Sequence, residues 1–216
     1  MRKYFVAICW LVIALLFISF LGFRKTYFNL FPAFTGTSWV IHFHVASILS
    51  WLALLFTQAF LAKSGRLELH QKIGKLSYIL VPVILTGFIL VTNHGQLKHK
   101  EPGLVAATFF DGSLFVLFYL LAILNRKNVN YHAPYMMLSA VPFINPGLGR
   151  FISPEVSLPI EFLLILTLLL TAYFKKKTFR PYLVALGSFI GLLLIVVYVS
   201  LINPKIIELI WTAIWG

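Results

Sequence analysis

Charged side chains are scarce in this chain. Asp, Glu, Lys and Arg make up 11% of its 216 residues, whereas 60% are hydrophobic and the mean hydropathy is +0.93. A soluble domain of similar length carries about 25% charged and 45–50% apolar residues. The shortage of charge therefore argues against an ordinary soluble domain and favours a membrane protein.

Cysteine and the common catalytic motifs are also lacking. The single cysteine, Cys9, can form no intrachain disulfide and completes no metal-binding motif. The sequence contains no HExxH pair and no recognisable Ser–His–Asp arrangement, which disfavours a hydrolase. Whether the protein is an enzyme is left open by the sequence.

Acidic residues are few as well. Six Asp and Glu stand against eighteen Lys and Arg, which gives a net charge of +12. The basic residues occupy short gaps between apolar blocks, where they orient helices and meet anionic lipid headgroups. We therefore expect the lipid bilayer as partner and no nucleic acid.

Long apolar blocks are what the sequence has instead. Each is close to the roughly 20 residues that a helix needs to cross the hydrocarbon core. They predict an all-α polytopic bundle of about seven transmembrane helices, forming one domain over residues 1–216. The first block is too long for a typical signal peptide and is expected to stay as a helix. The expected spans are residues 4–22, 39–62, 74–92, 104–124, 134–151, 158–174 and 182–203.

The charges also predict an orientation. Connectors on the side of the N-terminus hold twelve Lys and Arg, and those on the other side hold six. The positive-inside rule then places the N-terminus in the cytoplasm and the C-terminus outside. We call the two sides inner and outer on this basis. The tail, residues 204–216, is expected to form an interfacial helix.

Proline predicts an irregular fifth span. Pro134 suits the first turn of a helix, but Pro142 and Pro146 interrupt the span, and each frees a backbone carbonyl. We expect this helix to be kinked or broken in its outer half, either for packing or to line a cavity.

Polar residues fall into two layers at the ends of the spans. The inner layer holds Glu68 and His70 before the third span and His132 before the fifth. His70 and His94 are 24 residues apart, or about 36 Å along a helix, so they cannot share a site. The outer layer comprises His42, His44, Asn93, His94, His99, Asp111, Asn145 and Arg150, with Glu155 and Glu161 at the start of the sixth span.

Histidines on different helices suggest a metal or haem. Neutral imidazole ligates transition metals, and membrane b-type haems take a pair of histidines each. His44 with His94, aided by Asp111, is one candidate site, and His70 with His132 is the other. The cofactor would be haem b or a transition metal. Interfacial histidines without a ligand are the alternative.

Two further features mark polar positions inside spans. Helical phase puts His44, Ser47 and Gln58 on one stripe, which predicts either a polar site or packing contacts between helices. A carboxylate within a span, as at Asp111, costs several kcal/mol unless it is paired or protonated. We expect Arg150, His44 or His94 as its partner, with Asn145 in the same layer.

Two segments resemble a known family. Residues 67–78, LELHQKIGKLSY, and residues 131–140, YHAPYMMLSA, are similar to helix-start motifs of uncharacterised bacterial multi-pass membrane proteins. The resemblance covers residues 39–151 and maps onto His70, Gly74, Ser77 or Tyr78, His132, Met136 and Arg150. The chain departs from the pattern at Gln71, where an Arg is usual, and at Ala133 and Pro134. The resemblance implies the bundle architecture and a bacterial cytoplasmic membrane, but it names no reaction.

Three functions remain open from the sequence. The first is a redox-linked protein that binds haem or metal and exchanges electrons with quinone or another membrane protein. The second is a small-solute or proton-coupled transporter, supported by Asp111, Arg150 and the interrupted fifth span. The third is a non-catalytic assembly or scaffold protein whose polar groups only hold helices together.

Overall fold

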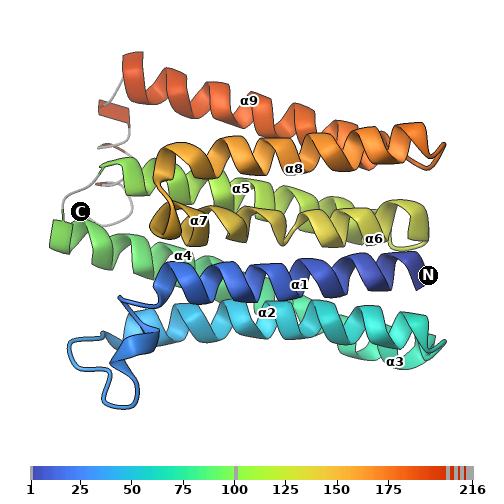
Figure 1. Ribbon diagram of the computed structural model, residues 1–216, viewed down its shortest axis with the longest axis horizontal. Coiled ribbons are helices and arrows are strands. Elements are labelled where there is room, and N and C mark those ends of the chain that lie inside the picture. Colours follow the sequence, from blue (N-terminus) through green and yellow to red (C-terminus); the bar gives the residue numbers. More distant parts are fainter. Residues whose placement is uncertain (1, 100–101, 203–204, 207–208, 210–211, 213–216) are drawn as a thin grey trace.

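A computed structural model describes residues 2–99, 102–202, 205, 206, 209 and 212. Within them, six segments are long and apolar enough to cross a membrane. They lie side by side with their axes roughly parallel (Figure 1). The predicted all-α membrane bundle is confirmed. The long helices are α1 (Arg2–Phe23), α2 (Trp39–Lys63), α4 (Ser77–His99), α5 (Pro102–Leu124), α8 (Pro154–Phe174) and α9 (Arg180–Ile202).

A seventh traverse is built from short pieces. Helix α6 (Val129–Leu138), the 3-10 turn η2 (Val141–Phe143) and α7 (Ile144–Phe151) follow one another along the bundle (Figure 1). Pro142 lies in the 3-10 turn itself, and Pro146 lies in the first turn of α7, where its missing N–H breaks no helical hydrogen bond. The predicted interruption is present, and it lies at the middle of the traverse rather than in its outer half.

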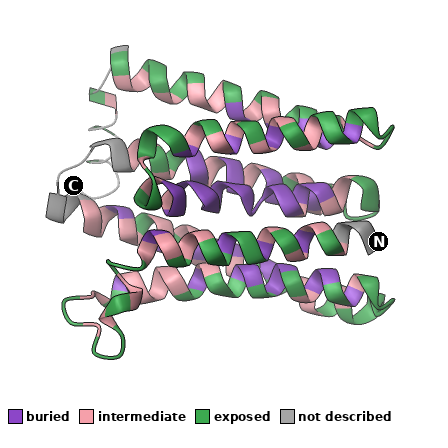
Figure 2. Cartoon of the chain, viewed as in Figure 1, coloured by how far each residue is buried: buried purple, intermediate pink, exposed green. Residues whose placement is uncertain are grey.

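The interruption is tolerated because it lies inside the protein. Residues 137–145 are all buried (Figure 2). Irregular backbone is excluded from contact with lipid but is accepted where neighbouring helices cover it. Ser139 at the break donates its hydroxyl to the Met136 carbonyl, at 2.7 Å.

Several boundaries differ from the sequence prediction. A separate short helix, α3 (Leu67–Gly74), precedes the third span, and α4 continues to His99 instead of ending near residue 92. Helix α8 begins at Pro154, four residues before the predicted start at 158. The connector after α1 contains the 3-10 turn η1 (Phe28–Leu30). The predicted interfacial tail falls largely outside the described residues.

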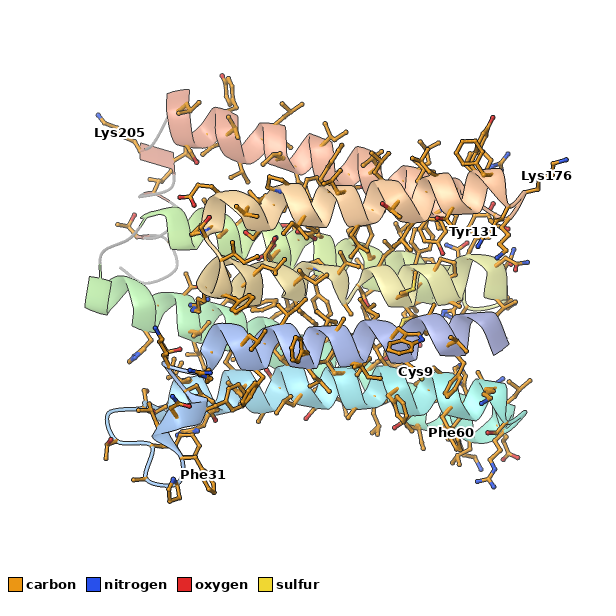
Figure 3. The ribbon with its side chains drawn as sticks, in the orientation of Figure 1. Cys9, Phe31, Phe60, Tyr131, Lys176 and Lys205 are labelled. Atoms are coloured by element: carbon orange, nitrogen blue, oxygen red, sulfur yellow. The ribbon has the colours of Figure 1, made fainter. Side chains whose placement is uncertain are left out.

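The connectors gather at two ends of the bundle. Tyr131 and Lys176 mark the inner end, and Phe31 and Lys205 mark the outer end (Figure 3). This agrees with the two sides assigned to the connectors from the sequence. Which end faces the cytoplasm stays a prediction.

An aromatic core surrounds the broken traverse. The rings of Trp51 on α2 and Phe115 on α5 have centroids 5.2 Å apart, and Phe115 lies 5.3 Å from Phe143 of η2. Phe88 of α4 also contacts Phe143, at 6.1 Å. Trp51 and Phe115 are fully buried. The core therefore holds the 3-10 turn between three long helices.

Glycine brings α1 against α7. A Cβ atom at Gly22 would lie 2.3 Å from the Gly147 carbonyl oxygen, and one at Gly147 would lie 2.8 Å from Ile18 Cγ2. Small residues allow such close approach between helices in a membrane, where packing supplies much of the attraction. The contact fixes the outer half of the broken traverse.

We expect Gly22→Ala to destabilise the bundle by about 1–3 kcal/mol, because the new methyl group forces α1 away from α7. Thermal unfolding of the purified protein measures this. Gly187→Ala on α9 is the matched control, since its Cβ would meet open space. Equal stability of the two variants would contradict the close packing of α1 and α7.

Candidate functional site

Three polar side chains meet inside the outer half of the bundle. The Asn145 amide nitrogen donates to Asp111 Oδ1 at 2.8 Å and to Glu161 Oε2 at 2.5 Å. The three residues come from α7, α5 and α8. We call them the carboxyl–amide cluster. One amide thus bridges two carboxyl groups.

The carboxyl–amide cluster is deeply buried. Glu161 is 0% exposed, and Asp111 and Asn145 are each 8% exposed. Asp111 is nine residues into α5 and Glu161 seven into α8, which is about 10–14 Å from the outer helix ends. Glu161 Oε1 and Asn145 Oδ1 have no hydrogen-bond partner among the described residues. Buried acceptors without a donor are costly and unusual.

The break in the fifth traverse positions the amide of the cluster. Asn145 is the second residue of α7, directly after the 3-10 turn. Helix α7 packs against α8, which carries Glu161, and η2 packs against α5, which carries Asp111. The interruption therefore sets the position from which one side chain reaches both neighbouring helices.

The other predicted outer residues lie apart from this cluster. The His44 ring packs against Phe88, with centroids 5.5 Å apart, and its Nδ1 has no partner among the described residues. The Arg150 guanidinium lies over the Phe23 ring at 4.6 Å and donates to the Pro146 carbonyl at 3.1 Å. Arg150 is also within electrostatic range of His44.

A three-ligand metal site has no support at this end. In the described part of the chain, no three His, Cys, Asp or Glu side chains gather closely enough to hold a metal ion. Asp111 bonds to Asn145 instead of to His44 or His94. The site predicted on His44, His94 and Asp111 stays a prediction. His42, judged interfacial from the sequence, contacts the Tyr27 hydroxyl through Nδ1 at 2.9 Å.

The inner end brings two predicted histidines together. The rings of His70 on α3 and His132 on α6 have centroids 6.3 Å apart and are nearly perpendicular, at 81°. Both residues are partly buried. His132 Nδ1 lies 2.8 Å from the Ala122 carbonyl oxygen of α5, and His70 Nδ1 lies 3.1 Å from the Gln58 carbonyl oxygen of α2. We call these two residues the histidine pair.

Gln58 adds a second contact to this pair. Its amide satisfies its neighbours when the oxygen accepts from Gly74 N–H at 3.1 Å and the nitrogen donates to the His70 carbonyl at 2.9 Å. The same nitrogen is then 2.7 Å from His70 Nδ1. The backbone oxygen requires a proton on Nδ1 and the amide requires a bare Nδ1, so the two contacts select different tautomers. In both tautomers, neither of these two contacts involves Nε2.

The polar stripe predicted along α2 is thus divided. Gln58 belongs to the inner end with His70. His44 and Ser47 lie at the outer end, where Ser47 Oγ donates to the His44 carbonyl at 2.8 Å. Glu161 was noted from the sequence only as a residue at the start of the sixth span. Its role in the cluster was not predicted, because the observed α8 starts earlier than the predicted span.

A large groove lies between α4, α5 and α9. It has a volume of about 780 Å³, and its walls include Phe88, Thr92, Phe109 and Val196. None of its lining residues is titratable. It therefore offers space for an acyl or isoprenoid chain but no acid–base or metal chemistry.

Comparison with protein-family models, curated proteins and solved structures found no match for this chain. The resemblance to uncharacterised bacterial membrane proteins stays a prediction. The carboxyl–amide cluster and the histidine pair are the features of the structure that bear on function.

We expect Asn145→Leu to lower the free energy of unfolding by about 2–5 kcal/mol, because it removes the donor shared by two buried carboxyl groups. Denaturant or thermal unfolding in detergent measures the change.

Asn125→Leu is the control for this prediction. Asn125 also donates through its amide, to the Leu121 carbonyl at 2.8 Å, but it is only partly buried. Its loss should cost about 1 kcal/mol. A smaller effect at Asn145 than at Asn125 would refute the bridging role of the Asn145 amide.

Proposed function

We propose that this integral membrane protein is redox-linked and holds a transition-metal centre, haem iron or a single metal ion, at the histidine pair. The observation that carries the proposal is the distance between the rings of His70 and His132. We place the protein in the bacterial cytoplasmic membrane, with this pair at the inner side, as the sequence predicts.

The ring spacing suits a metal between two imidazoles. A metal–imidazole bond is about 2.0–2.1 Å long and the bound nitrogen lies roughly 1 Å from its ring centre, so imidazoles on opposite sides of one metal have ring centres about 6 Å apart. Tetrahedral ligation brings the centres to roughly 5 Å. The observed separation is 6.3 Å. His70 and His132 would thus be close enough to hold one metal ion, or the iron of a haem, between their rings.

The contacts of the ring nitrogens support the same role. A ligating histidine usually donates its other N–H to a carbonyl or carboxylate, which fixes the tautomer and the ring orientation. Nδ1 of His132 and Nδ1 of His70 each lie beside a backbone carbonyl oxygen. Ligation through Nε2 replaces any proton there and leaves Nδ1–H to donate to the carbonyl. At His70, this keeps the contact with the Gln58 carbonyl and gives up the hydrogen bond from the Gln58 amide nitrogen.

Charge at the inner end suits an anionic group. Lys75, Arg126 and Lys127 lie in or beside the connectors there and are exposed, whereas Lys72 is paired with Glu68 at 2.7 Å. The first three would pair with the propionates of a haem or with anionic lipid headgroups.

A redox-active metal or haem iron held there would supply one-electron transfer. His70 and His132 would hold the centre, and the Gln58 and Ala122 carbonyls would keep both rings in place. The electron partner would be quinone or another membrane protein.

Protein purified from its native membrane should show a Soret absorption band, or bound metal by elemental analysis where no such band appears. His132→Gln should lose the band or the metal, because the amide keeps polarity but cannot replace imidazole.

His42→Gln is the matched control and should retain the Soret band or the bound metal, since His42 lies at the outer end and contacts Tyr27. A colourless, metal-free wild-type protein would reject the proposal. So would undiminished metal in folded His132→Gln.

Proton-coupled transport is the second candidate. The observation in its favour is the carboxyl–amide cluster beside an interrupted traverse, an arrangement common in transporters. The scaffold alternative would require that neither polar site binds anything.

A further inference from the structure

The carboxyl–amide cluster has an unbalanced charge when both acids are ionised. Two carboxylates then face one amide in a buried region, and the amide contributes no charge. Like charges held this close in an apolar surrounding repel strongly. One added positive charge relieves most of this repulsion.

The hydrogen bonds of the cluster point to the same need. Asn145 directs its amide nitrogen at both acids, yet its own oxygen and Glu161 Oε1 lack a donor in the described part of the chain. A carboxyl group that binds a proton becomes a donor as well as an acceptor. A proton on Glu161 Oε1 would turn one of these two acceptors into a donor.

Other charged and titratable groups lie near this end of the bundle. These groups are Arg24 and Lys25 after α1, His44 on α2, His94 on α4, Arg150 on α7, Glu155 on α8 and Tyr198 on α9. The hydrogen bonds that join the two acids come from the Asn145 amide.

We propose that Asp111, Asn145 and Glu161 form a binding site for one exchangeable monovalent cation, with a proton as its occupant. The two acids hold the cation and Asn145 keeps them together. The site is separate from the histidine pair: Asn145 is 13 residues from His132 along the traverse, or about 20 Å. This cation site does not depend on a metal at the inner end.

The path for a proton from the outer end of the bundle to this site is shorter than the path from the inner end. Ser157 lies one turn outward from Glu161 on α8 and is 5% exposed. Its hydroxyl lies beside Gly149 of α7, where a Cβ would be 3.8 Å from Ser157 Oγ. Arg150, the next residue of α7, is exposed. The Ser157 hydroxyl donates to the Pro154 carbonyl at 2.9 Å, on the outward side of Glu161, and we assign exchange to that side.

A hydrophobic carbodiimide tests the site directly, because it reacts with a protonated carboxyl group in an apolar surrounding. The full-length protein in nanodiscs is treated with dicyclohexylcarbodiimide over a range of pH, and modified peptides are identified by mass spectrometry. We expect modification at Glu161 or Asp111 that increases as the pH falls. Glu161→Gln or Asp111→Asn, whichever removes the modified residue, should abolish it.

Glu155→Gln provides the control, since Glu155 is an exposed carboxyl group on the same helix as Glu161. It should leave the modification unchanged. Size-exclusion chromatography and thermal unfolding establish that each variant is folded. Both substitutions within the cluster keep an oxygen that can accept from Asn145, so their folds should persist.

Three outcomes would overturn the proposal. Folded wild-type protein that stays unmodified at every pH would show that neither acid holds a proton. Modification that does not vary with pH would show that the proton does not exchange. Protection by Na⁺ but not by choline at constant pH would assign the site to Na⁺ instead of a proton.

Discussion

The cost of leaving polar groups unpaired in hydrocarbon governs this structure. In a bilayer every backbone N–H and C=O must find a partner within the protein, and this requirement forces the apolar segments into helices. The traverse α6–η2–α7 departs from that pattern, so it has to lie where other helices cover it. Burial of residues 137–145 meets the condition. The aromatic rings around Phe143 and the contact of Gly22 with Gly147 hold it there.

The segment that contains the buried interruption also supplies a residue to each of the two polar sites. Asn145 follows directly after the break and reaches acids on two neighbouring helices. His132 lies at the opposite end of the same traverse and meets His70. One irregular segment therefore contributes to both polar sites, about 20 Å apart along its axis. The separation allows a metal at the inner end and a cation at the outer end to bind independently, through different residues.

Much of the architecture could be predicted because it depends on local properties. Apolar length identifies the spans, proline identifies the interruption, and the positions of His70 and His132 at the inner ends of two spans bring them to one depth. The hydrogen-bond partner of a buried polar residue depends on which helices are neighbours. The periodicity of a single sequence does not reveal these neighbours. Helical phase placed Gln58 with His44, but their separation along α2 puts them at opposite ends.

Glu161 illustrates the effect of a helix boundary. A predicted start at residue 158 put this acid at the membrane surface, where a carboxylate needs no explanation. The observed start at Pro154 places it about two turns inside α8, where it is fully buried. Four residues of error therefore concealed one of the two acids in the cluster. Likewise, Asp111 was recognised as costly from its position, but its Asn145 partner could be identified only from the packing of α5, η2 and α7.

Anomalous X-ray diffraction from crystals of protein purified from its native membrane would locate a metal bound at the histidine pair. We expect an anomalous peak between His70 and His132, with an Nε2 atom of each residue within about 2.0–2.1 Å of it. Well-ordered rings with no peak between them, in protein that had not been exposed to chelator, would contradict this expectation.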